Sequence, residues 1–140
     1  MQILDTESNT YVDVNTLSIP QTLPEYKVWK IEKIYQQCLV DVETGFTSES
    51  TGYSFPLNKD YMDNFTQAGL AFVLDLDLEG VPFNTTNYGL KVLNREQFKA
   101  IFKEGKTHKE NLLMRYFVLK AQIEDSTCDT IAKAELINWG

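Results

Sequence analysis

Histidine and cysteine, on which many catalytic and metal sites depend, are scarce in this sequence. Its 140 residues include one histidine, His108, and two cysteines, Cys38 and Cys128. Neither cysteine has a second thiol nearby, so neither belongs to a metal-binding knuckle or a redox pair, and we expect both to be buried core thiols. Any catalytic triad with a histidine base would depend on His108. Because His108 lies among lysines, we expect it to be a solvated residue in the first turn of a helix.

Clusters of basic residues and long apolar runs are also absent. The net charge is -7, from 13 basic and 20 acidic residues, and no basic residue precedes Lys27. Because clustered lysine and arginine hold nucleic acids and anionic membranes, we expect neither nucleic acid nor membrane as a partner. No stretch approaches the roughly 20 apolar residues of a membrane span. No run typical of a signal peptide is present, so we expect synthesis in the cytoplasm.

The sequence also lacks the short motifs of known catalytic sites. It has no serine elbow, phosphate loop or zinc signature. The stretch Asp75–Gly80 resembles the start of a calcium-binding loop, but Thr86 stands where a bidentate acid is needed, so we interpret the stretch as the solvent face of a strand. Pairs of acids suited to glycoside cleavage can always be found among 20 acidic residues, but elements this short leave little room for a substrate groove. We expect no enzymatic activity, no metal and no cofactor.

Apolar residues are abundant enough for one mainly α-helical domain. Hydrophobic residues make up 43% of the chain and aromatic residues 12%, which is ample for a core. The apolar periodicity predicts helices over residues 25–44, 59–74, 94–104 and 107–124, and a short final helix through residue 134 capped by Ser126 or Thr127. Segments 73–83 and 88–92 predict a two-stranded β element with residues 84–87 at its tip. We expect a small four-helix domain over residues 23–140, with an N-terminal β-like arm over residues 1–22.

Capping residues predict where several of these helices begin and end. Pro24 suits the first turn of the first helix, and Gly45 fits a C-terminal stop in which glycine takes the left-handed conformation. Asn58 is a candidate N-cap of the second helix. Asn94 and Gln97 form a polar capping pair at the start of the third.

The strongest apolar pattern lies near the C-terminus. Gly105 predicts a stop between the third helix and the last long one. Beyond it, one stripe with flanking residues predicts at least one broad buried face; it comprises Leu112, Tyr116, Leu119 and Ile123, with Leu113 and Phe117 beside them. We expect Ile137 and Trp139 to fold back onto the helices, because a tryptophan left in water gains nothing.

The first helix carries a second regular stripe. Apolar residues follow one another at spacings of three and four, as in about two heptads of a coiled coil; they are Val28, Ile31, Tyr35, Cys38 and Val42. Two explanations stay open at this point. The stripe packs on its own domain, or it forms a seam with symmetry-related copies.

Residues 1–22 differ from the rest of the chain. Two short apolar runs, Gln2–Leu4 and Tyr11–Val14, flank a polar cluster suited to a turn, which predicts a hairpin or an extended arm. A lone hairpin is marginal in water. We expect the arm to dock on its own domain or to add to a neighbour's sheet.

Two parts of the sequence carry a family resemblance. Between residues 34 and 65 a helix-like run ends at Gly45-Phe46, a Ser/Thr-rich segment follows, and residues 52–56 (GYSFP) lead into a second helix. The second part is the end of the chain, from Ala121–Thr127 to Leu136–Trp139, which is similar to the end of the same domain family. The sequence resembles, over roughly residues 31–139, a domain family of unknown function found among tail-fibre and baseplate genes of tailed bacteriophages. A histidine near position 108 recurs in that family, which implies a packing or capping part.

The resemblance implies a virion setting, with the protein made in the host cytoplasm. We expect a structural component of the tail, baseplate, neck or fibre that acts by protein–protein assembly with other phage structural proteins, in several copies and as a possible homo-oligomer. The alternative is a tail-fibre assembly chaperone that is absent from the mature particle; a small inhibitor of a host factor fits less well. The candidate partner-binding residues are Ile3, Leu4, Tyr11, Val12, Val14, Val28, Ile31 and Tyr35.

Overall fold

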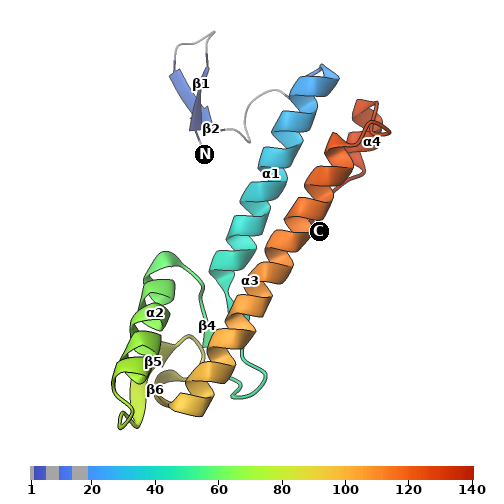
Figure 1. Ribbon diagram of the computed structural model, residues 1–140. Coiled ribbons are helices and arrows are strands. Elements are labelled where there is room, and N and C mark those ends of the chain that lie inside the picture. The colour runs from blue at the N-terminus through green and yellow to red at the C-terminus, as the bar shows by residue number, and fades with distance from the viewer. Residues whose placement is uncertain (1, 6–9, 14–18) are drawn as a thin grey trace.

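The computed structural model describes residues 2–5, 10–13 and 19–140 (Figure 1). These residues form four helices, which are α1 (Leu23–Thr44), α2 (Lys59–Leu74), α3 (Arg95–Glu124) and α4 (Ile131–Glu135). Their strands form three antiparallel pairs, which are β1 (Gln2–Asp5) with β2 (Thr10–Asp13), β3 (Phe46–Thr47) with β4 (Ser54–Phe55), and β5 (Gly80–Thr85) with β6 (Gly89–Asn94). The predicted mainly α fold with small β elements is confirmed.

The two long helices, α1 and α3, run side by side in opposite directions (Figure 1). They share an apolar cluster centred on Ile34, Cys38 and Ile123, each of which is at most 1% exposed. Pro24 lies in the first turn of α1, as predicted. Gly45 ends α1, so the predicted glycine stop is confirmed, but with φ of 92° and ψ of -156° its backbone is not in the predicted left-handed helical conformation.

α3 corrects one prediction. We expected Gly105 to end one helix and a second helix to begin at residue 107, but α3 is continuous over 30 residues, and Gly105 is buried in its interior. A β-carbon at Gly105 would lie 2.8 Å from Cε1 of Phe46. The glycine therefore provides room for an aromatic ring from β3, and it does not break the helix.

A second, aromatic core joins α2, the β5–β6 hairpin and the first part of α3. Its buried rings are Phe55, Phe65, Phe72, Phe83 and Phe98. The predicted caps hold this unit together. Asn58 caps α2, and Asn94 and Gln97 form a complete capping box at the start of α3.

The segment between α2 and β5 differs from its prediction. Residues 75–79, expected to form the solvent face of a strand, instead make the turn that follows α2, and the strand begins at Gly80. Asp75 takes the C-cap position of α2, and its carboxylate Oδ1 accepts from the backbone N–H of Asp77 at 3.0 Å. The carboxylate of Asp75 therefore stabilises this turn.

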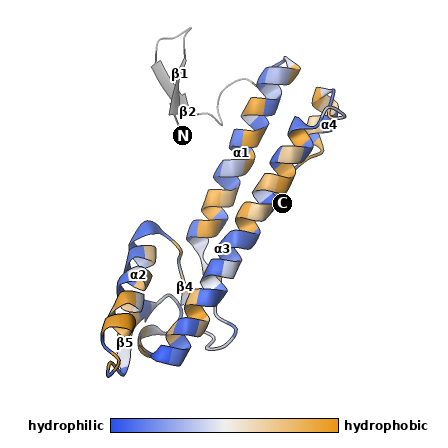
Figure 2. Cartoon of the chain, viewed as in Figure 1, coloured by the Kyte–Doolittle hydropathy of each residue, from blue (hydrophilic) through white to orange (hydrophobic). Residues whose placement is uncertain are grey.

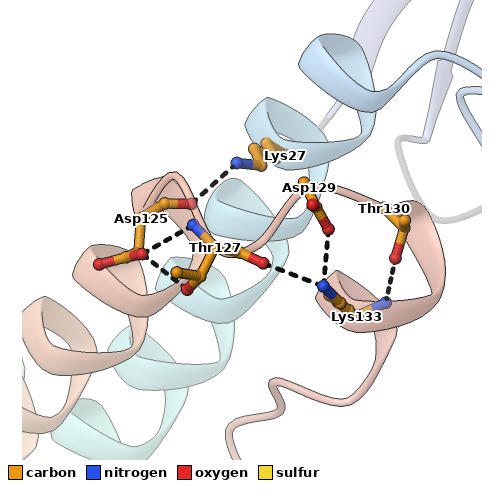
Figure 3. A network of polar contacts seen from close by, with 6 residues as sticks. All are labelled: Lys27, Asp125, Thr127, Asp129, Thr130 and Lys133. Carbon is orange, nitrogen blue, oxygen red and sulfur yellow. Dashed lines mark hydrogen bonds and ion pairs between the residues drawn. The ribbon is translucent and has the colours of Figure 1, made fainter.

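The C-terminal turn is fixed by a polar network (Figure 3). Asp125 Oδ1 accepts hydrogen bonds from the backbone N–H and the hydroxyl of Thr127, at 2.8 and 2.7 Å, and these bonds hold the pKa of Asp125 below its ordinary value. The Lys133 ammonium lies 2.7 Å from Asp129 Oδ1. α4 is capped by Thr130, not by Ser126 or Thr127 as predicted.

Candidate protein interface

The C-terminal segment covers part of the α1–α3 pair. Trp139 is 6% exposed, and its indole Nε1 donates to Asp41 Oδ2 at 2.7 Å. The Arg115 guanidinium lies 4.4 Å from the centre of the indole ring, which is a cation–π contact. Ile137 packs against the same apolar cluster. The prediction that Ile137 and Trp139 fold back onto the helices is confirmed.

The side of α3 that faces away from α1 is apolar and exposed. Met114, Phe117 and Val118 are 63%, 55% and 48% exposed, and their spacing places them on one helical face. We call these three residues the α3 outer stripe. The residues of α3 that pack toward α1 lie on the other face; they are Leu112, Tyr116, Leu119 and Ile123. Over residues 112–119, α3 is therefore apolar on two opposite faces, with Arg115 as the one charged residue of this stretch, whereas a helix with a single buried face is polar on the other.

The C-terminal half of α2 also carries apolar residues on opposite faces (Figure 2). Leu70, Val73 and Leu74 are 57%, 71% and 76% exposed, and Leu76 in the following turn is 83% exposed. The opposite face of this half carries Phe72, which belongs to the aromatic core. Apolar side chains exposed singly are normal, but a contiguous group marks an interaction surface. We call Leu70, Val73, Leu74 and Leu76 the α2 outer stripe.

A groove of about 310 Å³ lies between α2 and α3. Phe46, Leu57 and Ile101 are among its apolar lining residues, and two lysines, Lys106 and Lys109, line it as well. We call it the α2–α3 groove. Its volume is at the lower end of the roughly 300–1,000 Å³ of ligand pockets. The groove therefore has room for a few side chains.

The two lysines that line the groove, Lys106 and Lys109, have different partners. Lys106 Nζ lies 3.6 Å from Glu110 Oε1. Lys109 is half-buried, and its ammonium donates to the thioether sulfur of Met62 at 3.8 Å. Among the residues that the structure describes, no carboxylate lies within ion-pair distance of Lys109. The α2–α3 groove is therefore largely apolar but contains the Lys109 ammonium, whose partner among the described residues is a weak acceptor.

The stripe predicted on α1 is divided between buried and exposed positions. Cys38 and Val42 are buried and Ile31 packs against their cluster, but Val28 is 70% exposed. Tyr35 is half-buried, and its ring packs at a tilt against that of Tyr116, with ring centres 5.0 Å apart. The buried residues of α1 instead recur every four positions; they are Tyr26, Lys30, Ile34, Cys38 and Val42.

Lys30 shows why the buried residues of α1 differ from the predicted stripe. It is 8% exposed, and its ammonium donates to Asn138 Oδ1 at 2.7 Å. Burial lowers the pKa of Lys30. The C-terminal segment thus covers a side of α1 that an isolated helix would expose, and it supplies an acceptor for the buried cation.

The other candidate partner-binding residues lie in the arm. Ile3 and Leu4 fall in β1, and Tyr11 and Val12 fall in β2; the register pairs Ile3 with Val12 and Leu4 with Tyr11. Val14 lies outside the described residues. The prediction that the arm contains a hairpin agrees with this backbone pairing, whereas its docking role stays a prediction.

His108 also differs from its prediction. It lies in the middle of α3, and its ring packs at a tilt beside that of Phe46, with ring centres 5.9 Å apart. His108 Nε2 and Glu104 Oε2 are buried, with no hydrogen-bond partner in the described part of the chain. His108 is therefore a packing residue beside β3, not a solvated residue of a first turn.

Within the described ranges, no group of three or more histidine, cysteine, aspartate or glutamate side chains is placed to hold a metal ion. Both cysteines are free and buried, as predicted, and burial raises the pKa of the Cys38 thiol. None of the described helices is both long and apolar enough to cross a membrane.

The structure defines the chain as a mainly α-helical protein whose helices keep exposed apolar faces. Residues 25–138 match the family described as Domain of unknown function (DUF4376), and the chain belongs to this family. No curated protein and no solved structure matches the chain.

The two outer stripes were not among the candidate partner-binding residues chosen from the sequence, and Phe117, expected beside the buried stripe of this helix, is exposed instead. A signal for them was present. Residues 68–74 (AGLAFVL) and 112–119 (LLMRYFVL) are nearly continuous apolar runs, whereas a helix with a single buried face alternates apolar and polar residues at a period of 3.6.

Proposed function

We propose that this chain is a structural component of a tailed-bacteriophage particle, in the tail, baseplate, neck or a fibre-associated position. It acts by burying its outer stripes against neighbouring structural proteins. The phage setting rests on the resemblance of residues 31–139 to a domain family found among tail-fibre and baseplate genes. In this proposal the chain is made in the host cytoplasm, resides in the virion, and is not an enzyme.

The observation that carries the proposal is the apolar surface of α3 on both of its faces. One face is buried against α1, while Met114, Phe117 and Val118 remain exposed on the other. Burial of apolar area contributes roughly 25 cal/mol per Å², so a neighbour that covers this stripe gains binding energy directly. Exposed apolar groups of this kind mark sites of protein association.

The proposal is tested by the protein content of purified phage particles. Mass spectrometry should find the chain at a fixed ratio to a major tail protein. Its absence from particles, together with defective fibres when the gene is deleted, would instead identify an assembly chaperone and contradict the structural role.

A matched pair of variants connects this test to the α3 outer stripe. Val118→Ser should leave the circular dichroism and melting of the free chain nearly unchanged, because an exposed side chain contributes little to folding. The same variant should reduce incorporation into particles. Val40→Ser is the control, since Val40 is 62% exposed on α1, away from both stripes. Equal incorporation of the two variants would show that the stripe is not the interface.

A further inference from the structure

We propose that the α2–α3 groove is the docking site for the N-terminal arm of a second copy of this chain. The inference deepens the proposed function, on which it rests, because it names the partner segment and the surface that receives it. Two features of the groove carry the argument. It is lined by apolar side chains, and it contains the half-buried ammonium of Lys109, which has no carboxylate partner among the described residues.

The arm has the complementary chemistry. Its two strands read Ile3-Leu4-Asp5 and Tyr11-Val12-Asp13, so in each an apolar pair is followed directly by a carboxylate. The arm also carries Glu7, and no lysine or arginine occurs before Lys27. An apolar side chain beside a carboxylate matches an apolar groove that holds an ammonium.

The charge of the groove differs from that of the chain as a whole. The chain has a net charge of -7, so most of its surface repels an acidic segment. The groove instead is lined by two lysines, Lys106 and Lys109. Other basic residues, such as Lys91 and Lys103, also have no ion pair among the described residues, so the groove is distinguished by its lysines together with its apolar lining.

The geometry of the fold favours an arm from a second copy. The arm joins α1 at its first residue, whereas the groove lies beside Phe46, just beyond the last residue of α1. The 22 residues of α1 span about 33 Å at 1.5 Å per residue. The link from Asp13 to Leu23 spans at most about 36 Å when fully extended. The hairpin of the same chain would thus reach the groove only with much of this link stretched out, which costs conformational entropy, while a neighbouring copy has no such limit.

The inference is tested with the full chain and a fluorescein-labelled synthetic peptide of residues 1–22. Fluorescence anisotropy should show saturable binding of the peptide, and sedimentation velocity should show concentration-dependent association of the chain that excess unlabelled peptide reverses. Lys109→Met keeps the apolar stem and removes the charge, so it should weaken peptide binding about tenfold. Lys99→Met, at an exposed lysine of the same helix, should bind like the natural chain.

A charge reversal on both sides sharpens the test. Lys109→Glu should abolish binding of the natural peptide and restore it for a peptide that carries Asp5→Lys and Asp13→Lys. A peptide that binds the natural chain and Lys109→Glu equally would overturn the inference. So would a full chain that stays monomeric at all concentrations. These outcomes are independent of the proposed function, because they leave the α3 outer stripe and the presence of the chain in particles unaffected.

Discussion

The two faces of α3 are made of similar residues but have different surroundings. Toward α1, Tyr116 and Ile123 pack into a shared cluster to which Trp139 also belongs. Away from α1, Phe117 and Val118 are about half exposed. Apolar spacing alone therefore identifies the faces that a helix can bury, and tertiary neighbours decide which face is buried within the chain. The face left over is available to another molecule.

The largest expected contrast compares one truncation on each face. Ile123→Ala should lower the free energy of unfolding by about 2–5 kcal/mol, because Ile123 is fully buried and its loss leaves a cavity. Val118→Ala should change it by about 0.5 kcal/mol or less. Urea denaturation of both variants measures the difference. Similar losses at the two positions would mean that the outer stripe is buried in the free chain.

A second contrast compares two glycines, Gly45 at the end of α1 and Gly52 in the loop that follows it. Gly45 and Gly52 both have positive φ, of 92° and 76°. A β-carbon at Gly45 would collide with the carbonyl oxygen of Phe55, whereas one at Gly52 would meet open space. Gly45→Ala should therefore cost about 3 kcal/mol and Gly52→Ala about 1 kcal/mol. Thermal unfolding of the two variants side by side measures the gap, and equal midpoints would refute the steric argument.

A third, smaller effect tests the hydrogen bond by which the C-terminal Trp139 is held to α1. Asp41→Ala leaves the Trp139 indole N–H without its acceptor at 2.7 Å, so the free energy of unfolding should fall by about 1–2 kcal/mol. The indole fluorescence of a Trp29→Phe background reports the same site. Asp41→Asn, which keeps an acceptor oxygen, is the control and should lose less; an Asp41→Ala chain as stable as its parent would contradict the packing described for Trp139.

The smallest effect is a dependence on pH. Hydrogen bonds from Thr127 lower the pKa of Asp125 in the folded chain. A depressed carboxylate pKa stabilises the fold above the ordinary value of about 4, and this contribution disappears as the pH falls through the folded-state pKa. Asp125→Asn should therefore be slightly less stable than the natural chain at pH 7 and equally stable near pH 2. Urea titrations at several pH values measure the trend, and a constant difference would rule it out.

Several local signals in the sequence predicted the local structure, although the cap of α4 proved to be Thr130 and residues 75–79 a turn. Asn58, Asn94 and Gln97 cap helices as expected because a cap depends on residues within one turn. Gly45 ended its helix for the same reason. The mainly α fold followed from these caps and from the apolar periodicity.

Features set by distant residues were not predictable in the same way. Gly105 has the sequence signature of a helix stop, but the ring of Phe46, 59 positions earlier, packs against it within a continuous helix. Lys30 is buried because Asn138 supplies an acceptor from the other end of the chain. Val28 and Val118 are likewise exposed because the apolar clusters of the chain bury other residues of α1 and α3.

In the proposed function, the α3 outer stripe contacts another protein in the assembled particle. Site-specific photo-crosslinking tests it directly, with benzoylphenylalanine in place of Phe117 and, as the control, in place of Val40. Irradiation of purified particles should give a covalent product between position 117 and a neighbouring virion protein, and none from position 40. Particles that contain the chain but give no product at position 117, or equal products at both positions, would show that the α3 outer stripe is not an interface.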